Sequence, residues 1–514
     1  MTNIALSGDA DGYQQLADPE PRAEPKRHSF RANALALAVG QGSTWVITAV
    51  TLALMPRYLG AEGMGQYSIG FTFGLLALSV GELGIATLIT KDAARSADAI
   101  AQRFSTAIWV AALLGSFVGL VGSLLALMLG YSYEARLAIV LGCVGVPFAL
   151  VTVLGLAAFQ GLEQMRYQAA WGIAKKGSLL LILIAVVAAG RGIVTLVVAY
   201  LILDVLLMIP VVVLLRRFVP FRIFSFSAAT AWYLVSRGVP YFAAGIFVIV
   251  YTATDIILLS ILADEHAVGL YTTPARVFGV VLFVPLVVIG VTFPRLTALQ
   301  AEDRAKLDRL VRDVLRIVVA VTIPTAIGVV ALSDPTLVGF LGEEFSASGP
   351  IIVVLAAAVI PTSILMITHM VLIAADRQLI WVLVMMLGLL AKIALNFALI
   401  PLFANWFDNS ALGAAVSLLS VEALLMASTI WLLPRSVFDK ATAAHYVRVL
   451  MAAAAAATVL ALFVPVKPLL AAPLGGFVYV TAALLLRAYR PAELVQWAQW
   501  ILGRSQTEDV PAGT

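Results

Sequence analysis

Residues 193–215 read IVTLVVAYLILDVLLMIPVVVLL, an apolar run that a single charged residue, Asp204, interrupts. The run is long enough to cross a bilayer as a helix, because a spanning helix needs about 20 mostly apolar residues. A transmembrane β-strand is only about 10 residues long and alternates in polarity. The run therefore predicts a transmembrane helix, and similar runs continue on both sides of it in the chain.

The whole composition agrees with this prediction. The chain has 514 residues, of which 62% are hydrophobic and 12% charged, whereas a soluble domain carries about 25% charged residues. We therefore expect an all-α, polytopic membrane protein with about 14 transmembrane helices. The predicted spans are 33–55, 65–90, 104–130, 137–160, 172–189, 193–215, 236–262, 268–294, 314–333, 350–374, 379–402, 411–433, 446–465 and 468–487.

The positions of Lys and Arg predict the orientation, because loops rich in these residues stay in the cytoplasm. An even number of spans places both termini on one side. The loops of the opposite side hold four basic residues, Arg57, Arg136, Arg191 and Lys467, and two more fall inside spans, Arg276 and Lys392. All other Lys and Arg residues lie on the side of the termini, so we expect the N- and C-termini in the cytoplasm.

A short internal repeat divides the chain. Gly65-Gln66-Tyr67 opens the second span and Gly269-Leu270-Tyr271 opens the eighth; Gly161-Leu162-Glu163-Gln164 ends the fourth and Asp376-Arg377-Gln378 ends the tenth. Parallel repeats are one known transporter plan, with the substrate site between the halves. The predicted division is a disordered cytoplasmic tail (1–32), two six-helix units (33–217 and 218–435), two extra transmembrane helices (436–490) and a cytoplasmic tail (491–514).

Polar side chains inside the spans mark the candidate site, because a charge within the bilayer is costly unless it meets a partner or water. Spans 1, 2, 7 and 8 each carry such side chains on one helical face, which indicates a wet cavity between the halves. A structural alternative stays open, because Ser and Thr often bond to their own helix and Asp255 could pair with Arg276. The polar residues expected to line the cavity are Gln41, Thr44, Thr48, Ser79, Thr252, Thr272 and Asn396.

Cationic side chains in such a cavity favour a phosphate ligand. Arg offers a planar fork that matches phosphate oxygens, and Lys offers a point charge. We expect Arg276, Lys392 and Arg57 to bind a pyrophosphate head group, and Asp255 and Glu82 are candidates to carry a coupling proton or to hold a sodium ion. The single cysteine, Cys143, excludes a multi-Cys metal site, and we expect no metal, no cofactor and no nucleic-acid partner.

Several stretches resemble the bacterial oligosaccharide and polysaccharide flippases of the O-antigen type, which belong to the multidrug/oligosaccharidyl-lipid/polysaccharide exporter superfamily. Asp255, Gly269, Tyr271 and Arg276 match the family's Asp in span seven, its Gly-x-Tyr and its Arg in span eight. The resembling stretches, which occur in family order, are 57–60 with 65–67, GLEQMRYQA (161–169), 254–278, FPRLTAL (293–299), 340–356 and 396–415.

The resemblance implies two six-helix bundles in a V around a central cavity that opens alternately to each side. It implies a substrate, an undecaprenyl-pyrophosphate-linked oligosaccharide, that moves across the cytoplasmic (inner) membrane for the assembly of a surface polysaccharide such as an O-antigen or exopolysaccharide. The lipid tail would stay in the bilayer, and a polysaccharide polymerase complex is an expected partner. The sugar unit, the coupling ion and the oligomeric state cannot be predicted from the sequence.

Two other classes of protein share part of this pattern. A multidrug or cation exporter of the same superfamily has the same architecture, but Arg276 and Lys392 disfavour an organic cation. A membrane glycan polymerase or ligase would be an enzyme, and it usually needs a large outside loop with Arg or His. The outside loops here are short, and the chain has no Walker A, His-Glu-x-x-His or Gly-x-Ser-x-Gly motif, so we expect a transporter rather than an enzyme.

Overall fold

The computed structural model describes residues 27–302, 304–331, 333, 341–437, 439–464 and 468–489, and within these ranges the secondary structure is helical, with turns and no strand. Most of the two predicted tails therefore lies outside the described residues, although residues 27–32 belong to the first helix. The helices are α1 (Arg27–Glu82), α2 (Ile85–Arg95), α3 (Ala97–Met128), α4 (Tyr133–Gly161), α5 (Met165–Ala188), α6 (Ile193–Leu215), α7 (Ala228–Leu262), α8 (Glu265–Val281), α9 (Phe283–Glu302), α10 (Arg304–Ala331), the 3₁₀ helix η2 (Glu343–Ser348), α12 (Gly349–Ala374), α13 (Gln378–Phe407), α14 (Ser410–Trp431), α15 (Lys440–Phe463) and α16 (Pro468–Leu485).

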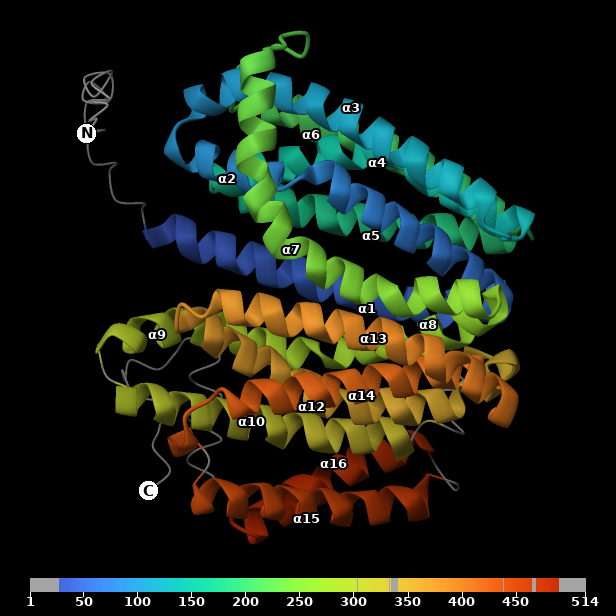
Figure 1. Ribbon diagram of the computed structural model, residues 1–514, viewed down its shortest axis with the longest axis vertical. Coiled ribbons are helices and arrows are strands. Elements are labelled where there is room, and N and C mark those ends of the chain that lie inside the picture. Colours follow the sequence, from blue (N-terminus) through green and yellow to red (C-terminus); the bar gives the residue numbers. More distant parts are fainter. Residues whose placement is uncertain are drawn as a thin grey trace, which may run out of the picture.

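The first two predicted spans both lie on α1. Gly60 interrupts this helix with a left-handed φ of 67°, which glycine adopts without steric cost. Figure 1 shows the chain crossing the molecule, turning at this point and returning. The returning arm then breaks at Leu83 and Gly84 and continues as α2 at an angle of 50°. A second predicted span, 268–294, is likewise divided at Leu282 into α8 and α9.

The helices have the length and composition of membrane spans. Among the described residues, ten helices are long and apolar enough to cross a membrane, and the bent pair that ends in α2 adds one more. Each predicted span overlaps one described helix or, for 65–90 and 268–294, two. The chain is therefore a multi-pass, all-helical membrane protein, and the count of fourteen crossings stays a prediction.

The helices pack in chain order. Figure 1 shows α1 to α6 side by side, with α1 in contact with α3, α4, α5 and α6. A second group contains α10, α12, α13 and α14, in which α12 contacts both α10 and α14. The helices α7, α8 and α9 pack on this group, α7 and α8 also contact α1, and α15 and α16 pack on α10 at the far edge. We refer to α1–α6 as the first set and to α7–α14 as the second set.

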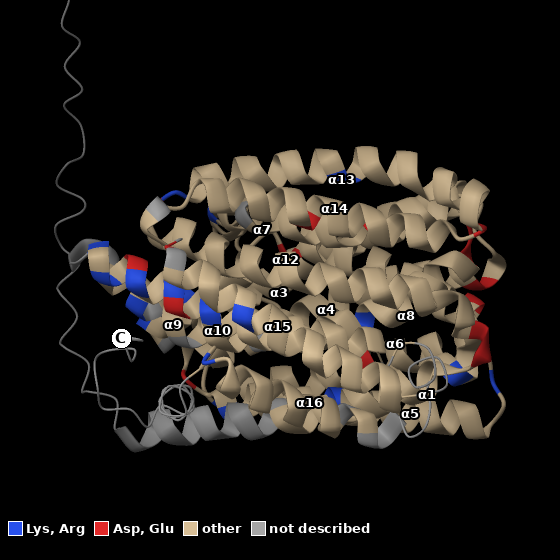
Figure 2. Ribbon diagram, turned by 90° about the horizontal axis from the view of Figure 1, so that it is seen from below, with Lys and Arg blue, Asp and Glu red and all other residues tan. Residues whose placement is uncertain are grey.

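The two ends of the molecule differ in charge (Figure 2). Glu265 bonds to Ser132, near Glu134, and Glu344 bonds to Ala61, next to Glu62. We call the end where these acids lie the acidic end, and the opposite end, where most Lys and Arg side chains gather, the basic end. The turn at Gly60 and the connection between α7 and α8 lie at the acidic end. The connections between α2 and α3 and between α6 and α7 lie at the basic end.

The structure supports the internal repeat that the sequence suggests. The turn after α4 and the turn after α12 have the same hydrogen bonds: Gln164 N donates to Phe159 O at 2.8 Å, and Arg377 N donates to Leu372 O at 2.9 Å. Glu163 and Asp376, one residue earlier in each turn, both have a positive φ, of 59° and 55°. The two turns are therefore equivalent, at a spacing one residue shorter than the sequence match.

Candidate functional site

The two sets of helices meet at two glycines of the repeated motif. An added Cβ at Gly65 of α1 would lie 1.7 Å from the carbonyl oxygen of Glu265, and one at Gly269 of α8 would lie 1.7 Å from that of Ala61. Such a distance is far below van der Waals contact, so only glycine allows the two backbones to approach this closely. The repeated motif thus lies where the two sets touch, and it also shows that the two halves of the chain correspond to each other.

A polar bridge lies one turn further along the same contact. The hydroxyls of Ser68 and Thr272 are 2.9 Å apart and buried, and Nη2 of Arg276 lies 3.4 Å from the Ser68 Oγ. The Arg276 guanidinium also lies over the Tyr67 ring, 5.2 Å from its centroid. A guanidinium on an aromatic face is held by a cation–π interaction and keeps some donors free to meet another group. Arg276 of α8 therefore reaches across the contact onto α1.

Two glutamates tie the acidic end together. The Glu265 carboxylate accepts from the backbone N–H of Ser132 at 2.8 Å, from the Ser132 hydroxyl at 2.7 Å and from the Gln66 amide at 3.1 Å. Glu344 of η2 accepts from the N–H of Ala61 at 3.1 Å. These bonds join α8 and η2 to α1 and α4, so the acidic end is closed in this conformation.

A second polar group lies within the second set and is fully enclosed. Lys392 of α13 is 1% exposed, and its Nζ lies 2.9 Å from Asp255 Oδ2 and 3.9 Å from the centroid of the Tyr251 ring. The other Asp255 oxygen accepts from Asn396 at 3.0 Å, and Tyr271 donates to Oδ2 at 2.8 Å. We call these residues the Asp255 cluster. In the described part of the chain, Asp255 therefore pairs with Lys392 rather than with Arg276.

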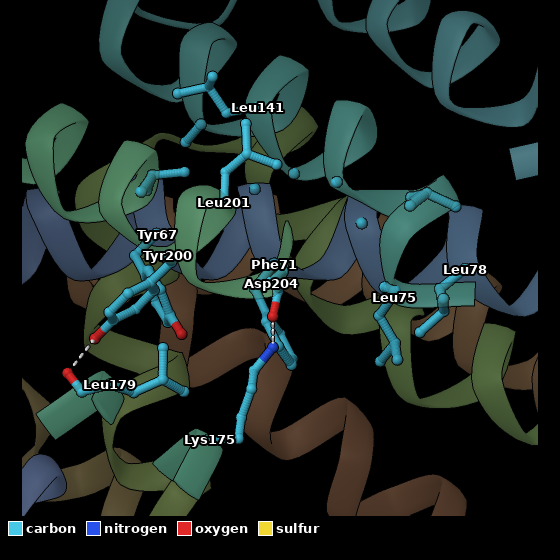
Figure 3. Close-up of a pocket in the computed structure, with 18 residues that line it drawn as sticks. Tyr67, Phe71, Leu75, Leu78, Leu141, Lys175, Leu179, Tyr200, Leu201 and Asp204 are labelled. Carbon is cyan, nitrogen blue, oxygen red and sulfur yellow. Dashed lines mark hydrogen bonds and ion pairs between the residues drawn. The ribbon is translucent and has the colours of Figure 1, made fainter. Parts of the chain in front are cut away.

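A cavity of about 300 Å³ lies inside the first set, between α1, α4, α5 and α6. Figure 3 shows Lys175 of α5 directed at Asp204 of α6 across it, and the two side chains form an ion pair. Tyr67 and Tyr200 lie at one end of the cavity, and the remaining wall is mostly apolar. The Arg276 guanidinium also lies over the Tyr67 ring. This ring therefore belongs both to the cavity wall and to the contact between the two sets.

The hydroxyl residues expected to line a cavity have mixed positions. Thr48 donates to the carbonyl of Thr44 and accepts from Lys176 at 3.0 Å, so it faces α5. Ser79 and Thr252 each bond to a carbonyl of their own helix, as the structural alternative predicts. Thr272 and Asn396 instead make contacts between helices. Thr44 is buried.

Three other predicted site residues lie outside these groups. The Gln41 side chain lies outside the described residues. Glu82 is partly buried beside the break between α1 and α2, where its carboxyl meets the backbone N–H of Ala86. Arg57 is exposed at the acidic end near Gly342. The predicted cationic residues Arg57, Arg276 and Lys392 therefore do not come together in this conformation.

The sequence reasoning missed several polar residues that the fold brings together. Lys175 lies near the start of the predicted span 172–189, where it counts with the basic residues of the cytoplasmic side, but α5 begins at Met165 and places it in the third turn. Tyr251 and Glu422, which bond at 2.8 Å, lie on spans seven and twelve and are fully buried. The sequence signal for Glu422 is that it is the one acidic residue within the apolar run 411–433. Among the described residues, no three His, Cys, Asp or Glu side chains gather as metal ligands.

The fold is similar to those of membrane transporters of known structure. It resembles the lipid II flippase MurJ in an inward closed conformation, with a TM-score of 0.72 and 13% identity over 88% of this chain and 98% of that one. It also resembles the inward-facing conformation of a MATE-family multidrug resistance transporter of the MOP superfamily, with a TM-score of 0.59 and 14% identity over 78% of this chain and 97% of that one. The outward-facing conformation of such a transporter matches with a TM-score of 0.52 and 14% identity over 78% of this chain and 94% of that one.

The sequence identifies the family to which the chain belongs. Residues 30–300 match the family described as polysaccharide biosynthesis protein, and the chain belongs to it. None of the curated proteins matches the sequence. The predicted membership of a polysaccharide-related family is therefore confirmed.

Proposed function

We propose that this protein is a flippase that moves an undecaprenyl-pyrophosphate-linked oligosaccharide from the inner to the outer leaflet of a bacterial cytoplasmic membrane, for the assembly of a surface polysaccharide. The family membership supports a role in polysaccharide biosynthesis. The likeness to MurJ, which is named a lipid II flippase, supports a fold suited to a lipid-linked substrate. The basic end would face the cytoplasm, because basic loops are retained there.

The observation that carries this proposal is the position of Arg276. This guanidinium spans the contact between the two sets on Tyr67 and Ser68, at the place where a substrate between the halves would lie. A guanidinium fork binds phosphate oxygens in two parallel hydrogen bonds. We propose that it holds the pyrophosphate, with Lys175 as a second cation from the first set and Arg57 meeting the head group at the acidic end.

Transport would follow from movement of two six-helix bundles, 33–217 and 218–435, which would form a V whose cavity opens alternately to each side. The bonds of Glu265 and Glu344 would break when the acidic end opens, and the glycine contact would separate. The remaining helices would give fourteen crossings, with both termini in the cytoplasm. Asp255 and Glu82 remain candidates for coupling to a proton or sodium gradient, and a polysaccharide polymerase would take up the product.

Cells deleted for this gene test the proposal. We expect loss of a surface polymer and accumulation of its lipid-linked units on the inner leaflet, both restored by the intact gene. Arg276→Ala should fail to restore the polymer at normal protein level in the membrane, while the exposed Glu62→Gln should restore it. Normal polymer in the deleted strain, together with increased sensitivity to cationic drugs, would contradict the flippase and favour a multidrug exporter.

A further inference from the structure

Glu422 of α14 is a buried acid that has no role in the sequence prediction or in the proposed transport function. It is 5% exposed and lies in the middle of the apolar helix Ser410–Trp431. Its Oε1 accepts a hydrogen bond from the Tyr251 hydroxyl at 2.8 Å. Its Oε2 is also buried and, among the described residues, has no hydrogen-bond partner. An ionised carboxylate would depend on the Thr362 hydroxyl for any hydrogen bond to this oxygen.

The charges around Glu422 do not balance if both local acids are ionised. The groups that act on it are Tyr251 and Asp255 of α7, Lys392 of α13 and the hydroxyl of Thr362 on α12. Lys392 already forms the ion pair with Asp255 at 2.9 Å, and Tyr271 of α8 donates to the same Asp255. His369 of α12 packs against the Trp381 ring and is not among the groups that act on Glu422. Two carboxyl groups thus share one ammonium in a region where an unpaired charge is strongly disfavoured.

A proton on Oε2 resolves both problems. It neutralises the second acid, and it turns Oε2 into a donor. The neighbouring Thr362 hydroxyl can accept from this proton as well as donate to a carboxylate, and its Oγ1 is likewise buried without a hydrogen bond to another described residue. The Tyr251 bond to Oε1 is kept, because a carboxylic acid retains an oxygen that accepts.

The position of Tyr251 connects this proton to movement. Its helix, α7, contacts α13 and α14 of the second set and also α1, α2 and α3 of the first set. Because α7 contacts helices of both sets, opening of the contact between the sets would displace α7 relative to α14 within the second bundle. Separation of Tyr251 from Glu422 would admit water to the carboxyl group and let the proton leave.

We infer that Glu422 is a proton-binding site of the transport cycle, occupied in this closed conformation and emptied when α7 moves relative to α14. The inference rests on the proposed transport function, because it assigns the proton a part in that cycle. Binding adds one proton to the Glu422 carboxylate from water, and release returns it.

Infrared spectroscopy of the purified full-length protein in lipid tests the occupied state without any substrate. We expect the band of a protonated carboxylic acid at neutral pH, and this band should shift when glutamate is labelled with ¹³C. It should be lost in Glu422→Gln and kept in Glu62→Gln, whose acid is exposed. Absence of the band from the unsubstituted protein, or its persistence in Glu422→Gln, would overturn the inference. If Glu422→Gln does not fold, Glu82→Gln decides instead: a ¹³C-sensitive band that belongs to Glu422 should be kept in this variant, and its loss would overturn the inference.

Two further measurements separate the remaining explanations. Loss of the band on adding NaCl at constant pH would overturn the inference in favour of a sodium site. Glu422→Gln imitates a permanently protonated acid, so it should fold with unchanged thermal stability and fail to restore polymer in the deleted strain. Full restoration would overturn proton exchange and leave a fixed structural proton. A deleted strain with normal polymer would instead refute the flippase, whatever the infrared result.

Discussion

Individual residues in this protein are charged where the surroundings are apolar, and Lys392 is the clearest case. Its side chain is 1% exposed, and the ammonium lies between a carboxylate and an aromatic ring. Removing one member of a buried ion pair leaves the other charge without compensation, which costs about 3–5 kcal/mol. Lys392 thus has a strong structural role in this conformation.

We predict that Lys392→Met strongly destabilises the protein, by about 3–5 kcal/mol, because Asp255 is left with a buried charge. Adding Asp255→Asn should recover most of this loss, because the double variant has no buried charge in the pair. Thermal unfolding of the purified variants in detergent measures both effects. Equal stability of Lys392→Met and the unsubstituted protein would contradict the enclosed ion pair.

The sequence identified the unusual residues but not their partners. Asp255, Arg276, Lys392 and Asn396 stand out because polar groups are rare inside spans. Their pairing depends on which helices become neighbours: Asn396 and Asp255 are 141 residues apart and bond at 3.0 Å. Charge alone favoured a pair between Asp255 and Arg276, whereas packing of α13 on α7 brings Lys392 to the carboxylate.

At the scale of single elements, the close contact of α1 and α8 depends on the absence of two side chains. We predict that Gly65→Ala and Gly269→Ala each lower stability by about 1–3 kcal/mol, because the added methyl group meets a backbone carbonyl that cannot move aside. Gly42→Ala is the matched control on α1, since nothing lies within 4 Å of its added Cβ. A melting temperature of Gly65→Ala equal to that of Gly42→Ala would contradict the contact.

The cap at the start of α15 predicts that the stability of the protein depends on pH. Asp439 caps this helix: its carboxylate accepts from Thr442 N at 2.7 Å and pairs with Arg312 at 2.9 Å. The bond from the Thr442 backbone, with help from Arg312 and Arg316, holds the pKa of Asp439 below its usual range. The stabilisation is therefore complete above the pKa of the unfolded chain and is lost as the pH falls through the lower pKa of the folded protein.

Substitutions at Asp439 separate the cap from the charge. Asp439→Ala should cost about 1 kcal/mol at neutral pH, and Asp439→Asn less, because Asn caps a helix about as well as Asp. Melting curves at neutral and acidic pH measure this. Both variants should lose the acid dependence that Asp439 contributes, and a variant that melts with the same pH dependence as the unsubstituted protein would refute the assignment.

The spans themselves were predictable, but their interruptions were not. The apolar runs predict fourteen spans, and each of these overlaps a helix of the structure. Span two, however, breaks at Leu83 and Gly84, where the φ of Gly84 is 71° and an added Cβ would lie 2.5 Å from the carbonyl oxygen of Gly238. That break depends on the approach of α7, about 150 residues later in the chain, which no local pattern contains.

At the scale of the whole molecule, the two halves of the repeat are held together at the acidic end. The hydroxyls of Ser68 and Thr272 are 2.9 Å apart across this contact. We predict that Ser68→Cys with Thr272→Cys, on a Cys143→Ala background that removes the one native thiol, gives a protein in which oxidation links the halves. Oxidation should stop transport and reduction should restore it.

The two single-cysteine variants are the controls for this cross-link. They should be unaffected by the oxidant, as measured by polymer production in the deleted strain. Continued transport by the linked double variant would show that the acidic end does not open, and so would contradict alternating access.

The most direct measurement of the central claim follows the substrate itself. Purified protein would be placed in vesicles that contain undecaprenyl-pyrophosphate-linked oligosaccharide, and the fraction of sugar reached by an external lectin or glycosidase would be followed in time. We predict that the protein exposes the inner-leaflet pool, and that Arg276→Ala does so much more slowly while Glu62→Gln does not differ. Equal exposure in vesicles with and without the protein would contradict a flippase.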